Sequence, residues 1–239
     1  QRLMGAIIVT LVLSLLVFGF MGFPVTLAPI GLAIGIWVMV GAIADLFDRA
    51  AFGRSQLGQS MARLRGLPRI VWSTTLAHFG MGVTVIGVVC ATAFQTELVT
   101  SMRPGETIDI SGYAITYEGE AQANGPNYTG ERGMFFIDGP WGNDRTLTSE
   151  RRIYPASGTP TTEAGIRTYG FSQMYIQFGE RFGEGGRVVR LWHKPYVLLI
   201  WLGTILMASG ALVSLTDRRM RIGAPAAARR KFSTTGAEQ

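Results

Sequence analysis

The sequence predicts an integral membrane protein with about four transmembrane α-helices and a small antiparallel β domain inserted between the last two helices. Three observations predict this fold class. The 239 residues are 48% apolar and only 16% charged, whereas about a quarter of the residues in a soluble domain are charged. Four apolar stretches approach or exceed the roughly 18–20 residues that cross a hydrocarbon core. A polar segment with strand periodicity separates the last two stretches.

The apolar stretches define the predicted helices. Residues 1–44 hold two of them, Leu3–Phe20 and Phe23–Ala44. The third helix is predicted over 71–94 and the fourth over 195–215. The chain starts almost directly in the first stretch, without a charged leader or a small-residue cleavage site. This pattern excludes a signal peptide, and we expect the chain to be a piece of a longer polypeptide.

Basic residues gather in two segments, the loop 45–70 and the tail 216–239. By the positive-inside rule both segments face the cytoplasm, which places residues 95–190 on the outer side of the membrane. The net charge of +6 therefore reflects topology, and no nucleic-acid-binding motif accompanies it. We expect the tail to be disordered. The basic residues concerned are Arg49, Arg54, Arg63, Arg65 and Arg69 in the loop, and Arg218, Arg219, Arg221, Arg229, Arg230 and Lys231 in the tail.

The segment 95–190 has the signature of a β domain. Alternating runs rich in β-branched and aromatic residues are separated by clusters of glycine, proline and asparagine. About 95 residues suffice for a small domain with its own core. We therefore expect a compact antiparallel domain that the third and fourth helices hold at both ends. The runs are Thr107–Ser111, Tyr113–Tyr117, Gly133–Ile137, Arg151–Tyr154 and Gln173–Gln177.

His78 is the candidate functional residue, because it lies inside the third apolar stretch. An ionisable side chain at membrane depth is costly unless it has a partner, so it marks a functional site by default. A neutral imidazole in a dry helix bundle can serve as an axial haem ligand. Thr74, Thr75, Gly82 and Val85 share its helix face. We expect Thr74 or Thr75 to hold the second imidazole nitrogen, and Gly82 to admit a porphyrin edge. A packing histidine bonded to a neighbouring helix is the structural alternative.

The remaining ionisable candidates have structural interpretations. Cys90, the single cysteine, lies in the third stretch and is expected to be a packing residue, so no disulfide forms within the chain. His193 suits an interfacial belt of aromatic and cationic side chains at the outer end of the last helix. The segment 95–190 contains no histidine or cysteine. Its paired carboxylates, Glu118/Glu120 and Glu180/Glu184, are expected on solvated faces.

Two glycine pairs have the spacing of close helix contacts. Gly31 and Gly35 are four residues apart, and Gly203 and Gly210 are seven apart, so the members of each pair lie roughly on one helix face. We expect both pairs to mark helix packing rather than a functional site.

Short motifs follow one another in order between residues 70 and 221: Leu76–Gly82, Met102–Glu106, Gly125–Asn127, Glu150–Pro155, Thr161–Ile166, Val189–Pro195, Ile200–Gly203, Met207–Gly210 and Asp217–Arg219. In order, spacing and topology they resemble the C-terminal part of the CcmF family. That family is the integral membrane haem lyase subunit of bacterial system I cytochrome c maturation. The first two apolar stretches carry less of the resemblance.

The resemblance implies a role in attaching haem to cytochromes of the c type. It implies that His78 is one of two axial ligands to a haem b, shared with a histidine upstream of this chain. It also implies a bacterial inner membrane location, with residues 95–190 in the periplasm. The implied partners are the haem chaperone CcmE, the subunits CcmH and CcmI, apocytochrome c with its Cys-x-x-Cys-His motifs, membrane lipid and, as an electron donor, quinol. The family's tryptophan-rich haem-handling motif and its external histidines are absent here, so the chain would supply only part of each haem site.

Two alternatives stay open. In a transporter domain, His78 would be a proton relay, and paired broken helices or an inverted repeat would be expected. In an assembly subunit without haem, the chain would be colourless and would only dock partners. The assignment as an enzyme also stays open, because the haem-handling motif lies outside this chain.

Overall fold

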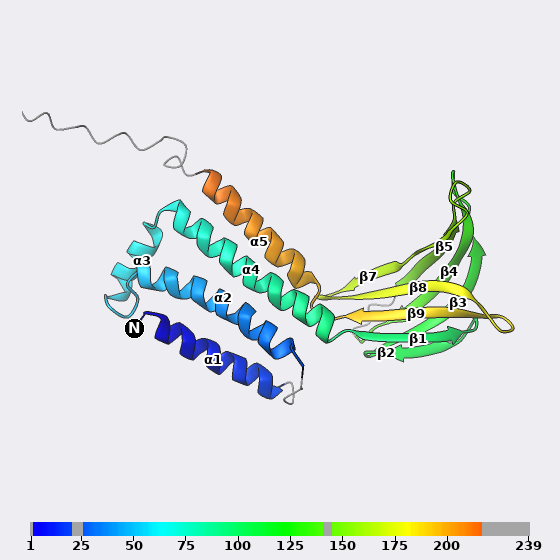
Figure 1. The fold of residues 1–239 in the computed structure, drawn as a ribbon, viewed down its shortest axis with the longest axis horizontal. Helices are drawn as coiled ribbons and strands as arrows, with labels where there is room; N and C mark the ends of the chain where they lie inside the picture. Colours follow the sequence, from blue (N-terminus) through cyan, green and yellow to red (C-terminus); the bar gives the residue numbers. More distant parts are fainter. Residues whose placement is uncertain (1, 21–25, 141–144, 217–239) are drawn as a thin grey trace, which may run out of the picture.

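The chain consists of a row of helices that lie side by side, with a β-sandwich at one end of this row (Figure 1). The computed structural model describes residues 2–20, 26–140 and 145–216. The predicted tail therefore lies outside the described residues, apart from Thr216. The helices are α1 (Arg2–Phe20), α2 (Ala28–Arg49), α3 (Leu57–Arg65), α4 (Arg69–Ala93) and α5 (Leu198–Leu215).

Three of these helices, α2, α4 and α5, are long and apolar enough to cross a membrane. At about 1.5 Å per residue, the 25 residues of α4 extend over roughly 38 Å, which exceeds the thickness of a hydrocarbon core. The apolar part of α1, Met4–Phe20, has 17 residues and is shorter than these three helices. The prediction of membrane helices is confirmed, and the count of four stays a prediction.

The helices lie side by side in the order α1, α2, α4, α5 (Figure 1), and each neighbouring pair is in contact. Glycines bring α4 and α5 close together. A Cβ atom added to Gly80 would lie 2.6 Å from the carbonyl oxygen of Gly203, and one added to Gly210 would lie 2.8 Å from that of Ser73. Gly31 and Gly35 of α2 face α4 in the same way, across from Val89 and Ile86. The prediction that these glycine pairs mark helix contacts is confirmed.

The segment 45–70, predicted as a basic loop, is mostly helical. It holds the end of α2, all of α3 and the start of α4. The Asp45 carboxylate and the Arg49 guanidinium form an ion pair of 2.8 Å one turn apart, which supports the extension of α2 beyond its apolar residues. Arg69, in the first turn of α4, donates to the carbonyl oxygen of Thr216 at 3.0 Å. This bond satisfies an orphan carbonyl at the end of α5.

The β domain is antiparallel, as predicted, and the structure divides it into two sheets. One sheet has the strand order β1-β9-β8-β7 and the other β2-β3-β4-β5-β6. The domain extends to Lys194 rather than residue 190, so the motif around His193 is a strand and not the start of the last helix. The strands are β1 (Thr96–Met102), β2 (Thr107–Ile110), β3 (Tyr113–Gln122), β4 (Thr129–Asp138), β5 (Arg145–Ile153), β6 (Pro160–Glu163), β7 (Gly165–Tyr169), β8 (Ser172–Phe182) and β9 (Gly186–Lys194).

The core of the sandwich lies between the two sheets. Alternate residues of each strand point inward, as the period of two requires. Phe135 of β4 and Phe178 of β8 are both fully buried and meet edge to face, with ring centroids 6.4 Å apart. All five sequence runs assigned as strands overlap strands of this domain, although the runs ending at Ser111 and Tyr154 extend one residue beyond β2 and β5. The other fully buried side chains of the core are Met102, Ile115, Tyr117, Ile137, Met174, Ile176, Val189 and Leu191.

Polar groups also join the two sheets. The Ser149 hydroxyl of β5 accepts a hydrogen bond from the buried backbone N–H of Phe178 at 3.0 Å and donates to the carbonyl of Glu163 at 2.8 Å. Arg187 of β9 reaches across the sandwich to carboxylates on β3 and β4. These contacts fix the register of one sheet against the other.

Candidate functional site

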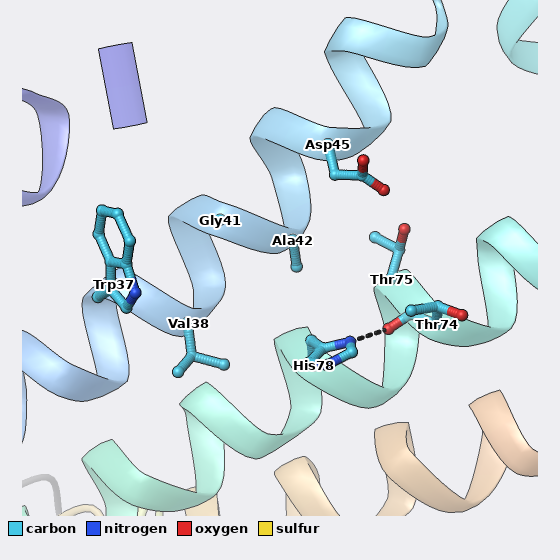
Figure 2. Close-up of a pocket in the computed structure, with 8 residues that line it drawn as sticks. All are labelled: Trp37, Val38, Gly41, Ala42, Asp45, Thr74, Thr75 and His78. Atoms are coloured by element: carbon cyan, nitrogen blue, oxygen red, sulfur yellow. Dashed lines mark hydrogen bonds between the residues drawn. The ribbon is translucent and has the colours of Figure 1, made fainter. Parts of the chain in front are cut away.

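A groove between α2 and α4 contains His78. Its volume is about 330 Å³, within the usual size range of a ligand site. Figure 2 shows that one wall comes from α2 and the other from α4. The α2 wall is apolar at one end and carries a carboxylate at the other. The lining residues are Trp37, Val38, Gly41, Ala42 and Asp45 of α2 and Thr74, Thr75 and His78 of α4.

The orientation of the His78 ring is set by its own helix. The Nδ1 atom lies 2.8 Å from the backbone carbonyl oxygen of Thr74 (Figure 2). A carbonyl only accepts hydrogen bonds, so in this contact Nδ1 carries the proton. In the neutral ring, Nε2 then keeps its lone pair. A bond from the second nitrogen to a carbonyl is the usual support of a metal-ligating histidine.

The hydroxyl groups near His78 do not hold its ring. Thr74 Oγ1 donates to the carbonyl of Ile70, and Thr75 Oγ1 donates to the carbonyl of Val71, both at 2.9 Å. The expected contact with Thr74 is therefore made by its backbone carbonyl rather than its side chain. His78 itself is exposed within the chain, nine residues after the start of α4, which is about 14 Å along the helix.

The expectation for Gly82 is wrong. We expected it to admit a porphyrin edge, but Gly82 is buried against α2. A Cβ atom at this position would lie 2.4 Å from Met39 Cγ and 2.7 Å from the carbonyl oxygen of Gly35. The glycine is needed because two helix backbones approach each other closely here. Its role is to bring α2 next to α4, and so to form the groove.

Sequence reasoning did not find Trp37 and Asp45. Both lie on α2, far from His78 in the sequence, and both line the groove. Asp45 Oδ2 accepts a hydrogen bond from Arg49 Nε at 2.8 Å. One signal was present in the sequence, since Asp45 directly follows an apolar stretch. That its carboxylate lines the same groove as His78 depends on how α2 is rotated against α4.

The groove fits a haem that is held from one side. It offers one imidazole with its Nε2 lone pair and an apolar wall. His193 lies on β9, so among the described residues His78 is the one histidine that lines the groove. The described residues also contain no group of three or more histidine, cysteine or acidic side chains arranged to hold a metal ion. The groove is therefore suited to a prosthetic group that a second structural element also contacts.

His193 has a different environment from the one expected. It lies on the core-facing side of β9, with its ring centroid 5.6 Å from that of Tyr113, and Tyr113 in turn contacts Tyr169 at 4.9 Å. Burial lowers the pKa of His193. The residue is thus part of an aromatic group that closes one end of the sandwich, rather than a member of an interfacial belt.

Two of the carboxylates predicted on solvated faces of the β domain also form ion pairs. Glu120 accepts a hydrogen bond from Arg187 Nε at 2.5 Å, and this bond lowers the pKa of Glu120. Burial, with the Glu120 charge as a second cause, raises the pKa of the neighbouring Tyr117 to about 12. Glu120 is nevertheless exposed, as expected, and it pairs with both Arg187 and Arg181. Glu180 also conforms to the expectation, because its side chain is 79% exposed although it pairs with Arg151.

The fold and the groove define a class of protein: membrane-length helices, one carrying an intramembrane histidine, with a β-sandwich between the last two helices. Comparison with known families places the chain within this class. Residues 93–195 match the family model described as the CcmF C-terminal β-sandwich. The chain is a CcmF-like fragment that corresponds to the C-terminal part of that family.

Individual relatives agree with this assignment. The chain is 43% identical over 233 residues to the cytochrome c-type biogenesis protein CycK of Rhizobium meliloti, which covers 98% of this chain and 34% of the relative. It is 32% identical over 217 residues to CcmF of Escherichia coli, covering 90% of this chain and 32% of the relative. A solved structure of the cytochrome c haem lyase CcmF has the same fold, with a TM-score of 0.66 over 88% of this chain and 34% of that chain, at 16% identity. The chain spans about one third of the length of these relatives.

Proposed function

We propose that the chain is the haem b-binding C-terminal portion of a membrane cytochrome c haem lyase. The single observation that carries this proposal is the state of His78, whose Nδ1 is bonded to the Thr74 carbonyl while the ring lines the α2–α4 groove. The relatives are cytochrome c-type biogenesis proteins by name. Since the chain spans one third of their length, the activity, substrates and partners of a whole relative are part of the proposal.

In this proposal His78 holds the haem iron through Nε2, and the Thr74 carbonyl keeps the ring in the required tautomer. Val38 and Ala42 line the groove with apolar side chains and would limit the access of water to the bound haem. When bound, haem b supplies one-electron chemistry, which would serve to reduce the incoming haem and so support thioether formation. The second axial ligand would come from a histidine upstream of this chain.

The proposal extends to location and partners. The arginines of the segment 45–70 favour the cytoplasmic side, and residues 95–190 would then be periplasmic in the bacterial inner membrane. The β domain would dock partners, CcmH and CcmI among them, or shape the entrance for haem that CcmE delivers. Apocytochrome c would receive the haem at its Cys-x-x-Cys-His motif, and quinol would supply electrons. Deleting residues 100–188 should abolish co-purification of CcmH and CcmI but leave some haem b; unchanged co-purification would contradict the docking role.

The direct test is a pyridine haemochrome assay with reduced-minus-oxidised visible spectra, carried out on the complete membrane protein that contains this chain, purified from its native membrane. We expect haem b in the wild type, its loss in His78→Ala and its retention in His193→Ala. The His193 variant is a matched control because it removes the only other histidine of the chain. Full haem in the His78 variant would refute the ligand assignment. A colourless wild type would favour an assembly subunit without haem.

One observation favours a second function. The carboxylate of Asp45 lines the same groove as His78, and a carboxylate near an intramembrane histidine is an arrangement that proton relays use. A transporter domain would then lose proton-coupled uptake in both Asp45→Asn and His78→Gln, while the wild type would contain no haem. A haem lyase should retain haem in Asp45→Asn, since that residue is not a ligand in the proposal.

A further inference from the structure

One end of the β-sandwich lies against the helices. The connection from β9 to α5 shows which part of the sandwich is level with the end of this membrane-length helix. Strand β9 ends at Lys194, and α5 begins at Leu198. The backbone N–H of Leu198 donates to the carbonyl oxygen of Phe171 at 3.2 Å. The turn between β7 and β8 is therefore level with the first turn of α5, where the membrane-length helix meets the β domain (Figure 1).

A polar pocket opens beside this turn. Its volume is about 440 Å³, and it lies between β7 and the first residue of β5. Two positively charged side chains line it, those of Arg145 and Arg167, and a phosphate would carry the opposite charge. No acidic side chain of the described residues lines it. The lining residues are Arg145, Ile166, Arg167, Thr168, Tyr169 and Gly170.

Arg167 has unused hydrogen-bonding capacity. Its side chain is half-buried, yet no hydrogen bond or ion pair joins it to another of the described residues. Every other arginine that is similarly buried in the β domain is paired: Arg151 with Glu180, Arg152 with Glu150, and Arg187 with two carboxylates. A guanidinium carries five N–H donors in a planar fork that matches phosphate oxygens. A half-buried cation of this kind calls for an anionic partner.

The surroundings of the pocket are those of a membrane interface. Phe171, at the tip of the β7–β8 turn, is 55% exposed, and Tyr196, just before α5, is 53% exposed. Gly170 has a φ of +57°, which the tight turn requires and which brings the phenylalanine to the tip. Further along α5, Trp201 and Ile205 are each 62% exposed. Aromatic rings at the headgroup level above an apolar helix face are typical of lipid contact.

We propose that this pocket binds the phosphate headgroup of an anionic phospholipid, with Arg167 as the principal contact and the acyl chains lying along α5. Phe171 enters the boundary between headgroups and acyl chains. The pocket thereby fixes the height of the β domain above the membrane. This assignment needs neither the haem proposal nor a particular side of the membrane, because it follows from the junction of β9 with α5.

A free phosphate ion would satisfy the same guanidinium, so the chemistry at Arg167 does not by itself identify a lipid. The position does favour one. Gly170 of the pocket precedes the exposed Phe171, whose backbone carbonyl is bonded to the first turn of the apolar helix α5, and a soluble anion would gain nothing from these apolar groups. A lipid gains both the charge-assisted hydrogen bonds and the apolar contact.

The test uses the full chain reconstituted in bilayers of phosphatidylcholine mixed with phosphatidylglycerol, followed by extraction and native mass spectrometry of retained lipid. We expect retained phosphatidylglycerol to exceed phosphatidylcholine in the wild type. Arg167→Gln should lower the phosphatidylglycerol retention about fivefold, which is the effect of one cation near a charged membrane surface. Arg167→Lys should restore most of it. Arg103→Gln is the matched control, because Arg103 is exposed and directly follows β1, at the end of that strand away from α4.

Two further arms separate the sources of phosphate. Phe171→Ser should weaken retention of the lipid, and inorganic phosphate should not displace phosphatidylglycerol from the wild type. Displacement by inorganic phosphate, with no effect of Phe171→Ser, would show a site for a free anion and overturn the proposal. Equal retention in wild type, Arg167→Gln and Arg103→Gln would overturn it as well.

Discussion

Replacement of Arg187 by methionine tests the link between the two sheets of the sandwich. The Arg187 side chain is 4% exposed, and its guanidinium contacts the carboxylates of Glu120 and Glu131 at 2.5 Å each. Its Cζ atom also lies 4.8 Å from the centre of the Phe178 ring. Methionine retains much of the apolar packing but removes the charge. Two carboxylates on the opposite sheet then lose their buried cation.

The magnitude follows from the burial of the three groups. Removing one partner of a fully buried ion pair costs about 3–5 kcal/mol. Here the carboxylates are 33% and 29% exposed, and both keep a contact with Arg181, which is itself 69% exposed. Solvent and Arg181 therefore screen part of the loss. We expect Arg187→Met to lower the free energy of opening of the sandwich by about 2–3 kcal/mol.

The assay is amide hydrogen exchange of the full chain in a lipid bilayer, because local opening can then be read strand by strand. Peptides from β3, β4 and β9 should lose protection, whereas those from α4 should be unchanged. Arg190→Met on the same strand is the control. Its ion pair with Glu97 spans 3.4 Å between side chains that are 48% and 43% exposed, so its effect should stay below about 1 kcal/mol. Equal effects of the two substitutions would refute the argument that Arg187 joins the sheets.

Three further predictions concern single sites. Gly80→Leu should force α4 and α5 apart and lower the thermal stability in detergent, because a Cβ atom there would lie 2.6 Å from a backbone oxygen; Gly5→Leu, with nothing within 4 Å of such an atom, should leave it unchanged. Ser149→Ala should cost about 1–3 kcal/mol, because it leaves the buried N–H of Phe178 without an acceptor; unaltered exchange of β8 would contradict this. Burial lowers the pKa of His193, so its contribution to stability is complete above the unfolded value of about 6.5 and is lost as the pH falls through the lower folded pKa. His193→Gln should remove that part of the acid sensitivity in a pH series of thermal melts, and an identical pH profile would contradict the assignment.

The prediction of strands in the β domain succeeded for a local reason. Alternation with a period of two appears within a few residues, and turn residues mark where it stops. The runs around Tyr113, Phe135 and Ile176 therefore sufficed to predict an antiparallel domain. The pairing of β1 with β9 joins strands at opposite ends of the domain, and no local pattern specifies it. The same is true of the division into two sheets.

The candidate site shows the same contrast between local sequence patterns and long-range contacts. His78 was evident from the sequence because an ionisable residue inside an apolar stretch is locally unusual. Its neighbours Trp37 and Asp45 were not, since they are brought to it by the rotation of α2 on α4. That rotation depends on Gly35 and Gly82, whose backbones approach each other in the structure. Gly82 was assigned to the wrong role because its spacing from His78 shows a shared helix face, but not what covers it.

The sequence by itself determined that this chain has apolar helices of membrane length, a β domain between the last two of them, and a histidine inside one of those helices. Hydropathy, alternation and charge placement report these features because each is a property of neighbouring residues. Tertiary structure alone decided which residues surround His78, that Arg187 pairs with Glu120 and Glu131 across the sandwich, and that Arg167 lies half-buried in a pocket between β7 and the start of β5. These contacts join residues far apart in the chain, so they exist only once helix rotation and strand pairing have been set by the packing of the whole molecule.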